Sequence, residues 1–411
     1  MEPILERCAG LDVHQETVVA CVMYGPLNGR PAKELRTFPT TTKGLMQLAD
    51  WLSERDCRDV AMESTGVYWK PVWNILETEF RLTLGNAQRI KNIPGRKTDA
   101  KDAEWICQLM RCGMIPGSYV PPREIREARD LTRRRRKMVQ ALTSEKNRVH
   151  KVLQDANIKL TTPVTDLFGV SGRALLQSLI DGEVLMEEQL LDVVKGKLRK
   201  KIPQIVEALN GRVTAHHRKM LERIMKHVVF LEEEIADLEM DIKNALKPYQ
   251  KELDLLDTIP GINQDAAADI LAEIGPNMDA FPTDHHLASW ATLCPGQNES
   301  AGKKRGAKTG KGNKYLKATV NQASNANVRS KDTRLYLFYQ RIKRRSGHSQ
   351  AIVAVSHLII RIIYYMLKTG TPYQELGDRF ESKKNQPSLN SLIRRIQKLG
   401  YDVQISERAP A

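Results

Sequence analysis

Short apolar runs separated by polar turns dominate the first 120 residues. Alternating apolar positions and β-branched residues predict strands, whereas spacings of three and four predict helices. The expected strands fall within residues 8–25, which hold two of them, and within 34–41, 58–65 and 81–86. The expected helices cover residues 42–56, 67–80 and 95–113. This order of elements indicates an α/β domain over residues 1–122.

The middle of the chain has a helical pattern. Residues 123–155 are basic and helical, and a weaker pattern follows as far as Pro203. Apolar residues then recur at spacings of three and four, at Leu221, Ile224, Val228, Leu231, Ile235, Leu238 and Ile242. Such heptads favour a coiled coil, so residues 123–250 are expected to form a helical arm that drives self-association into a dimer or tetramer. The alternative is that two helices of one monomer pack against each other.

A third, mainly helical domain is expected over residues 251–380, with a tail over 381–411. Residues 255–275, LLDTIPGINQDAAADILAEIG, are typical of a helix-hairpin-helix, whose backbone N–H groups commonly contact phosphates. A plain helical turn is the alternative. A glycine-rich basic loop occupies residues 294–317, and helices are expected to follow it.

Composition narrows the class of partner. The 64 Lys and Arg exceed the 49 Asp and Glu, and a net charge of +15 favours a nucleic acid over a membrane surface. The most apolar run, residues 351–367, is interrupted by Ser356, His357 and Arg361, which fits a buried helix. The six cysteines form no C-x-x-C pair, which disfavours a zinc knuckle and suits a reducing cytoplasm.

Four acidic residues have the order expected of a two-metal site. Asp12 lies on or just after the first expected strand, Glu63 ends the strand at 58–65, and Asp99 and Asp102 open a helix. A ribonuclease-H-like sheet uses this order to gather carboxylates around two hard divalent cations, which assist phosphoryl transfer. The alternative for Asp99 is a helix N-cap, and a single acid at a strand end is commonly a solvated residue.

Two basic runs are expected to contact phosphates, which gives affinity without sequence selection. A solvated face is the alternative for each run. The candidate residues are Arg133, Arg134, Arg135 and Arg136 in the first run, and Lys303, Lys304, Arg305, Lys308, Lys311 and Lys314 in the second.

Several motifs together resemble a known family. The segments GLDVHQETVVACV, AMESTGVYW and GRKTDAKDAEW resemble the N-terminal motifs of the DEDD transposases of the insertion sequence one-ten family, which includes the Piv invertase. The segments LLDTIPGINQDAAADILAEIG, FPTDHHLASWATLCPGQNESAGKK and KGNKYLKATVNQA resemble that family's second conserved domain. The resemblance implies a RuvC-like catalytic domain, a coiled-coil arm and a small C-terminal transposase domain. It also implies that Asp12, Glu63, Asp99 and Asp102 bind Mg²⁺.

The same resemblance implies a serine that attacks DNA and a noncoding bridge RNA that pairs with donor and target DNA. Ser300 matches best, although Ala301 separates it from Gly302, and Ser324 is the second candidate. The expected function is therefore a DNA transposase or recombinase in the bacterial cytoplasm, associated with the nucleoid. The alternatives are a site-specific invertase, a junction-resolving nuclease that uses water as nucleophile, and a non-catalytic nucleic-acid-binding protein.

Overall fold

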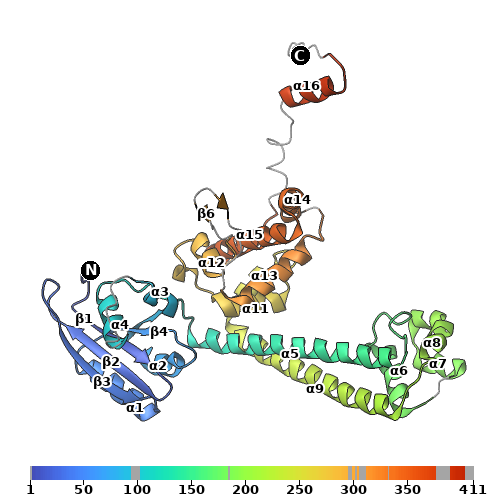
Figure 1. Ribbon diagram of the computed structural model, residues 1–411, viewed down its shortest axis with the longest axis horizontal. Coiled ribbons are helices and arrows are strands. Elements are labelled where there is room, and N and C mark those ends of the chain that lie inside the picture. Colours follow the sequence, from blue (N-terminus) through green and yellow to red (C-terminus); the bar gives the residue numbers. More distant parts are fainter. Residues whose placement is uncertain are drawn as a thin grey trace. The chain divides into compact units, whose positions relative to one another are not determined.

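The structure is a computed structural model that describes residues 2–93, 102–183, 186–294, 299–300, 303–304, 312–331, 333–375 and 389–402. The chain divides into two compact units, Met1–Val120 and Pro121–Ala411. Figure 1 labels the elements of both units.

The first unit contains a five-stranded mixed sheet in the order β3-β2-β1-β4-β5. β1 is antiparallel to β2, and β2 to β3, whereas β1, β4 and β5 are parallel. The strands are β1 Arg7–Val13, β2 Thr17–Tyr24, β3 Ala32–Pro39, β4 Asp59–Glu63 and β5 Arg81–Gly85. All the strands expected from the sequence are therefore confirmed, and the unit is an α/β domain.

Helices cover both faces of this sheet. α1 (Thr42–Ser53) and α2 (Trp69–Leu76) contribute to a large apolar core on one face, and α4 (Asp102–Arg111) lies on the other; the short α3 (Ala87–Lys91) follows β5. Because side chains alternate along a strand, odd-numbered residues of β1 such as Leu11 enter the core of α1 and α2, and even-numbered residues such as Cys8 face α4. Burial on both faces explains why β1 and β4 are almost continuously apolar.

The second unit begins with two long helices, α5 (Arg123–Asp155) and α9 (Ala215–Leu246). They pack antiparallel, because Val149 and Leu153 near the end of α5 share a core with Leu221 near the start of α9, whereas Met138 contacts Leu231 (Figure 1). Four shorter elements join them: α6 (Val170–Asp181), α7 (Glu187–Val193), the 3-10 helix Gly196–Lys201 and α8 (Ile202–Leu209).

The heptad positions of α9 are satisfied within the chain. Leu221, Ile224 and Val228 are buried in the core that α9 shares with α5 and the short helices. Leu231 and Ile235 are buried against Met138 of α5. The apolar stripe is therefore buried within one chain, as expected if two helices of one monomer pack against each other. These contacts do not support self-association through the stripe, which stays a prediction.

The rest of the second unit is mainly helical. Its elements are the 3-10 helix Lys247–Tyr249, α10 (Gln250–Asp257), α11 (Gln264–Ile274), the 3-10 helix Met278–Ala280, α12 (Asp284–Trp290), the two-residue strands β6 (Glu299–Ser300) and β7 (Lys303–Lys304), α13 (Lys314–Asn327), α14 (Arg334–Ser346), α15 (His348–Thr369) and α16 (Leu389–Lys398). α10 and α11 pack together across the hairpin at Gly261, which has φ +86°.

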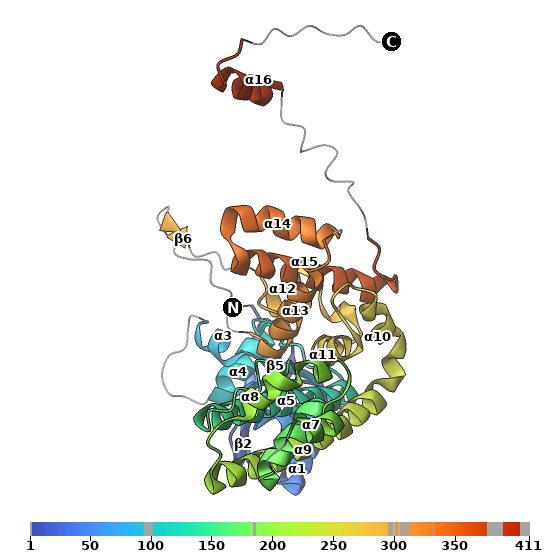
Figure 2. The same cartoon turned by 90° about the vertical axis from the view of Figure 1, so that its right-hand side faces the viewer.

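α15 contains the apolar run at residues 351–367. By length and composition it is the one helix among the described residues that could cross a membrane, yet half of its most apolar stretch is buried inside the protein. Its buried side chains pack against α12, α13 and α14, and Figure 2 shows α14 and α15 side by side. These contacts are those expected of a core helix.

Truncating Leu231 tests where the heptad packs. Leu231 is 4% exposed between α9 and α5, so Leu231→Ala should lower the free energy of unfolding by about 2–5 kcal/mol in chemical denaturation. Met240→Ala is the matched control, because Met240 lies on the same helix and is 62% exposed; its effect should stay within about 0.5 kcal/mol. A fall in molecular mass by light scattering with no loss of stability would instead place Leu231 between two copies.

Candidate active site

Asp12 and Glu63 lie at the carboxyl ends of two neighbouring parallel strands. Leu11 of β1 is opposite Met62 of β4, so Asp12 and Glu63 are the next residues in the same register. Ala61 belongs to the apolar cluster beneath α4, and alternation along β4 places Glu63 on that face as well. Both carboxylates are therefore on the side of the sheet that α4 covers.

The first residue of α4 adds a third carboxylate. Partial burial is the main cause that raises the pKa of Asp12 above its ordinary value, and the adjacent His14 opposes this effect. The negative charges of Asp102 and Glu63 raise the pKa of Asp12 further. Because repulsion of this kind requires short separations, Asp12, Glu63 and Asp102 form one acidic cluster.

Two polar side chains, which were not among the residues expected from the sequence, form hydrogen bonds to these carboxylates. Nε2 of His14 is 3.0 Å from Oδ2 of Asp12. The hydroxyl of Thr65 donates to Oε1 of Glu63 at 2.5 Å. Each of them is two residues beyond its carboxylate in the sequence. A polar residue two positions after an acid at a strand end could therefore have predicted these hydrogen bonds.

The cluster is chemically suited to a hard cation. Carboxylate oxygens are the ligands that Mg²⁺ prefers, and a cation would relieve the mutual repulsion that the pKa of Asp12 records. Within the described residues, no group of three or more His, Cys, Asp and Glu side chains has the arrangement of a metal site. The fourth candidate, Asp99, lies outside the described residues.

A glycine sets the distance between α4 and the sheet. A Cβ atom on Gly10 would lie 2.2 Å from the backbone nitrogen of Cys107 and 2.4 Å from the carbonyl oxygen of Ala103. These separations are far below van der Waals contact, so α4 can approach β1 only where this side chain is absent. Gly10 precedes Asp12 by two residues and lies on the same face of β1. The close approach therefore brings the start of α4, with Asp102, to Asp12.

The candidate nucleophile Ser300 is in a short hairpin of the second unit. Its backbone belongs to β6, which pairs antiparallel with β7 so that Ser300 is opposite Lys303 and Glu299 is opposite Lys304. Lys314, at the start of α13, is exposed. The remaining candidates of this run, Arg305, Lys308 and Lys311, lie outside the described residues.

The second candidate nucleophile, Ser324, is buried in α13 and is 0% exposed. Its hydroxyl is 2.8 Å from both the carbonyl oxygen of Val320 and the hydroxyl of Ser356, which in turn donates to Asn321 at 2.7 Å. This network ties α13 to α15. Attack on DNA by Ser324 would require the two helices to separate.

Three of the four arginines predicted to contact phosphates have partners inside the second unit. Nε and Nη2 of Arg133 donate to the two carboxylate oxygens of Glu273 of α11, at 2.7 and 2.8 Å, and Glu273 is 2% exposed. Arg135 binds Asp265 and Asp269 of the same helix, at 3.0 and 2.9 Å.

The other two arginines of this run differ from each other. Arg136 donates to the carbonyl oxygen of Tyr315 and to the hydroxyl of Thr319. Arg134 is exposed. A phosphate would have to compete with internal partners at Arg133, Arg135 and Arg136, and contact at Arg134 stays a prediction.

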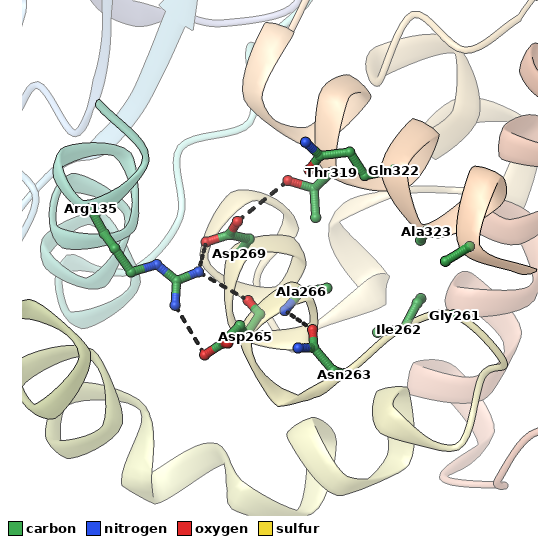
Figure 3. Close-up of a pocket in the computed structure, with 11 residues that line it drawn as sticks. Arg135, Gly261, Ile262, Asn263, Asp265, Ala266, Asp269, Thr319, Gln322 and Ala323 are labelled. Atoms are coloured by element: carbon green, nitrogen blue, oxygen red, sulfur yellow. Dashed lines mark hydrogen bonds and ion pairs between the residues drawn. The ribbon is translucent and has the colours of Figure 1, made fainter. Parts of the chain in front are cut away.

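A cleft of about 530 Å³ adjoins these ion pairs. Figure 3 shows the guanidinium of Arg135 directed at Asp265 and Asp269 on one side, with Thr319 and Gln322 across the cleft. The hairpin that precedes α11 also lines it. Arg135 and Arg136 both lower the pKa of Asp269, against the larger effect of burial, which raises it. The charges are thus matched within the protein, and no excess positive charge is directed into this cleft.

The acidic partners of the arginines could have been found in the sequence. Asp265, Asp269 and Glu273 recur every four residues, which places them on one face of α11. Arg129 and Arg133 have the same spacing on α5, and Arg129 also pairs with Glu273. Two complementary charged stripes on helices predict contact between those helices.

Comparisons with known proteins agree with this architecture. A model of the DEDD transposases of IS110, described as a transposase, matches residues 9–158. A second model, described as the transposase IS116/IS110/IS902 family, matches residues 253–340. The two matches define a transposase, which cuts and rejoins DNA. More specifically, the chain belongs to the IS110 family of insertion-sequence transposases.

Two relatives have related names. A probable family 20 transposase of Pseudomonas aeruginosa is 26% identical over 325 residues, which cover 77% of this chain and 85% of the relative. The insertion element IS110 uncharacterized 43.6 kDa protein of Streptomyces coelicolor is 30% identical over 133 residues, or 32% of each chain. The family resemblance noted in the sequence is therefore confirmed.

Gly10→Ala tests the close approach of α4. The added Cβ would meet backbone atoms that cannot rotate away, so we expect a loss of stability of about 1–3 kcal/mol and faster hydrogen exchange over residues 102–111. Gly117→Ala is the control in the same unit, because its Cβ would be 3.7 Å from Thr83, an ordinary contact. Unchanged exchange over residues 102–111 in Gly10→Ala would show that α4 does not depend on this glycine.

Proposed function

We propose that this chain cuts and rejoins DNA through a divalent-metal site at Asp12, Glu63, Asp99 and Asp102 and a serine nucleophile at Ser300. The observation that carries the proposal is the acidic cluster at the ends of β1 and β4 and the start of α4. Family membership supports DNA as the substrate.

The sheet supports a RuvC-like classification of the first unit. Three antiparallel strands are followed by two parallel ones, and the central strand β1 carries the first acid. This arrangement places Asp12 beside Glu63, as a ribonuclease-H-like site requires. The proposed organisation is a catalytic domain over residues 1–122, an arm over 123–250 and a transposase domain over 251–380.

The four acids would hold two Mg²⁺ ions. When bound, the ions stabilise negative charge on the attacking and leaving oxygens of phosphoryl transfer. The protein contributes a fixed donor set: the register of β1 and β4 aligns Asp12 with Glu63, and Gly10 lets α4 bring Asp102 close. His14 and Thr65 orient two of the carboxylates by hydrogen bonds.

Ser300 would attack the scissile phosphorus. Its oxygen forms a phosphoester with one DNA strand, the bond to the neighbouring sugar oxygen breaks, and that oxygen takes up a proton while the serine proton passes to water. Attack by a hydroxyl of a second strand then reverses the process and joins the strands. The neighbouring basic residues, Lys303 and Lys304 among them, are suited to neutralise phosphate charge.

We also propose that target choice is guided by a bridge RNA and that the active assembly is a homo-oligomer. The family resemblance supports the RNA, and the net charge of +15 fits a protein that binds two nucleic acids. Sequencing of RNA that co-purifies with the protein tests this part. Absence of an element-encoded RNA would favour a site-specific invertase that recognises DNA directly.

Asp102→Asn tests the metal site. Removal of this charge should abolish strand cleavage in Mg²⁺ while binding to DNA survives, because the substitution preserves the shape of the side chain. Asp59→Asn is the matched control, since Asp59 lies at the opposite end of β4 and pairs with Arg81 on the surface. Full cleavage by Asp102→Asn, measured on a labelled substrate, would remove Asp102 from the site.

Ser300→Ala tests the nucleophile. The variant should bind DNA normally but lose both recombination and the covalent protein–DNA adduct, and mass spectrometry of the wild-type adduct should locate the nucleotide on the peptide with Ser300. Ser324→Ala is the comparison, because its buried hydroxyl predicts a loss of stability without loss of the adduct. Normal cleavage by Ser300→Ala would favour a nuclease that uses water.

A further inference from the structure

The last turns of α14 carry a group of basic side chains outside the two basic runs expected to contact phosphates. Arg341, Lys343, Arg344 and Arg345 are all exposed. Helix spacing places Arg341 on the same face as Arg344 and Arg345, three and four residues later. The opposite side of α14 is anchored, because Leu335 and Tyr339 are buried against the rest of the unit.

These side chains have no acidic partner in the part of the chain that the structure describes. Residues 333–374 contain no Asp or Glu, so neither α14 nor α15, which packs beside it, supplies a negative charge. Among the described residues, Glu375 is the nearest acid in sequence, and it accepts a hydrogen bond from the backbone nitrogen of Arg334 at the other end of α14. Asp332, which precedes α14 in the sequence, lies outside the described residues. No described acid therefore compensates the positive charge at the end of α14.

This surface contrasts with the arginines of α5. Arg133 and Arg135 are ion-paired with α11, so they are committed to packing. At the end of α14, the contacts within the protein are with aromatic rings: the guanidinium of Arg341 lies 5.2 Å from the ring centre of Phe338, and Nζ of Lys343 lies 5.5 Å from that of Tyr339. Such contacts hold the stems in place and leave the charge available to an anion.

The negative end of the helix dipole favours cations at the end of α14. Because this effect is confined to the last turn, it does not account for four basic side chains. Clustered like charges repel each other, and a surface of this kind is suited to a regular array of anions. A duplex provides that array, because its phosphates follow one another along both strands. The substrate of the family is DNA, which makes a DNA duplex the occupant that the chemistry favours.

We propose that the basic end of α14, formed by Arg341, Lys343, Arg344 and Arg345, binds the phosphate backbone of a DNA duplex. The contacts supply affinity and little sequence selection, since phosphates carry no sequence information. The surface does not depend on the metal site or on Ser300, so it can be tested without cleavage.

The experiment measures binding of the full chain to a short fluorescein-labelled DNA duplex by fluorescence anisotropy, in EDTA and over a range of salt. The triple variant Arg341→Gln, Arg344→Gln, Arg345→Gln should bind roughly a hundredfold more weakly at about 0.1 M salt. The slope of log affinity against log salt should become shallower by about three, one for each lost phosphate contact. A triple variant with Lys at the same positions should retain both the affinity and the slope.

The control removes the same number of charges elsewhere. Lys219→Gln, Arg223→Gln and Lys226→Gln act on α9, where acids such as Glu222, which pairs with Lys226, are adjacent. This control should bind DNA almost as the wild type does, and circular dichroism should show that all variants are folded. Equal losses in both triple variants would mean that net charge alone matters and would overturn the proposal. Loss of affinity for an RNA duplex with no loss for DNA would overturn the assignment to DNA.

Discussion

The second unit depends on ion pairing between one face of α5 and one face of α11. Glu273 is almost completely buried, and it is surrounded by Arg133, Arg129 and the side-chain amide of Asn313. A buried carboxylate is tolerated only when it is paired, and leaving such a charge without its partner costs about 3–5 kcal/mol. Because Asn313 caps α13, the same carboxylate links α5, α11 and the start of α13.

The chain has an excess of basic residues, and this pairing distinguishes those that are ion-paired inside the protein from those that are exposed to solvent. Arg133 and Arg135 of α5 resemble a nucleic-acid contact in the sequence, but their charge is used to hold helices together. At the end of α14 no acid of the described part of the chain pairs with the basic side chains, and they are exposed to solvent. The partition follows from the positions of the acids, which lie every four residues on α11 and are missing over residues 333–374.

In the first unit the decisive constraint is steric. Two parallel strands place Asp12 beside Glu63, and this juxtaposition needs only the register of β1 and β4. The third carboxylate comes from a helix, whose distance from the sheet is set by the absence of a side chain at Gly10. The raised pKa of Asp12 is the electrostatic consequence of burial and of bringing like charges together, and it is the condition that a divalent cation would relieve.

Local pattern determined most of the elements. Period-two runs located all five strands of the first unit, and helical spacing located α1, α2, α4, α5 and α9, because these signals depend on which face of one element is apolar. The order of the acids along the chain also predicted their convergence at Asp12 and Glu63, since parallel neighbours end at the same edge of a sheet. Tertiary structure decided what local pattern leaves open. An apolar stripe such as that of α9 requires a partner surface but does not specify which one. A basic run does not reveal whether its side chains pair with acids inside the protein or stay exposed to bind phosphates. The heptad residues of α9 pack against α5, and Arg133 pairs with Glu273, because the fold brings those surfaces into contact.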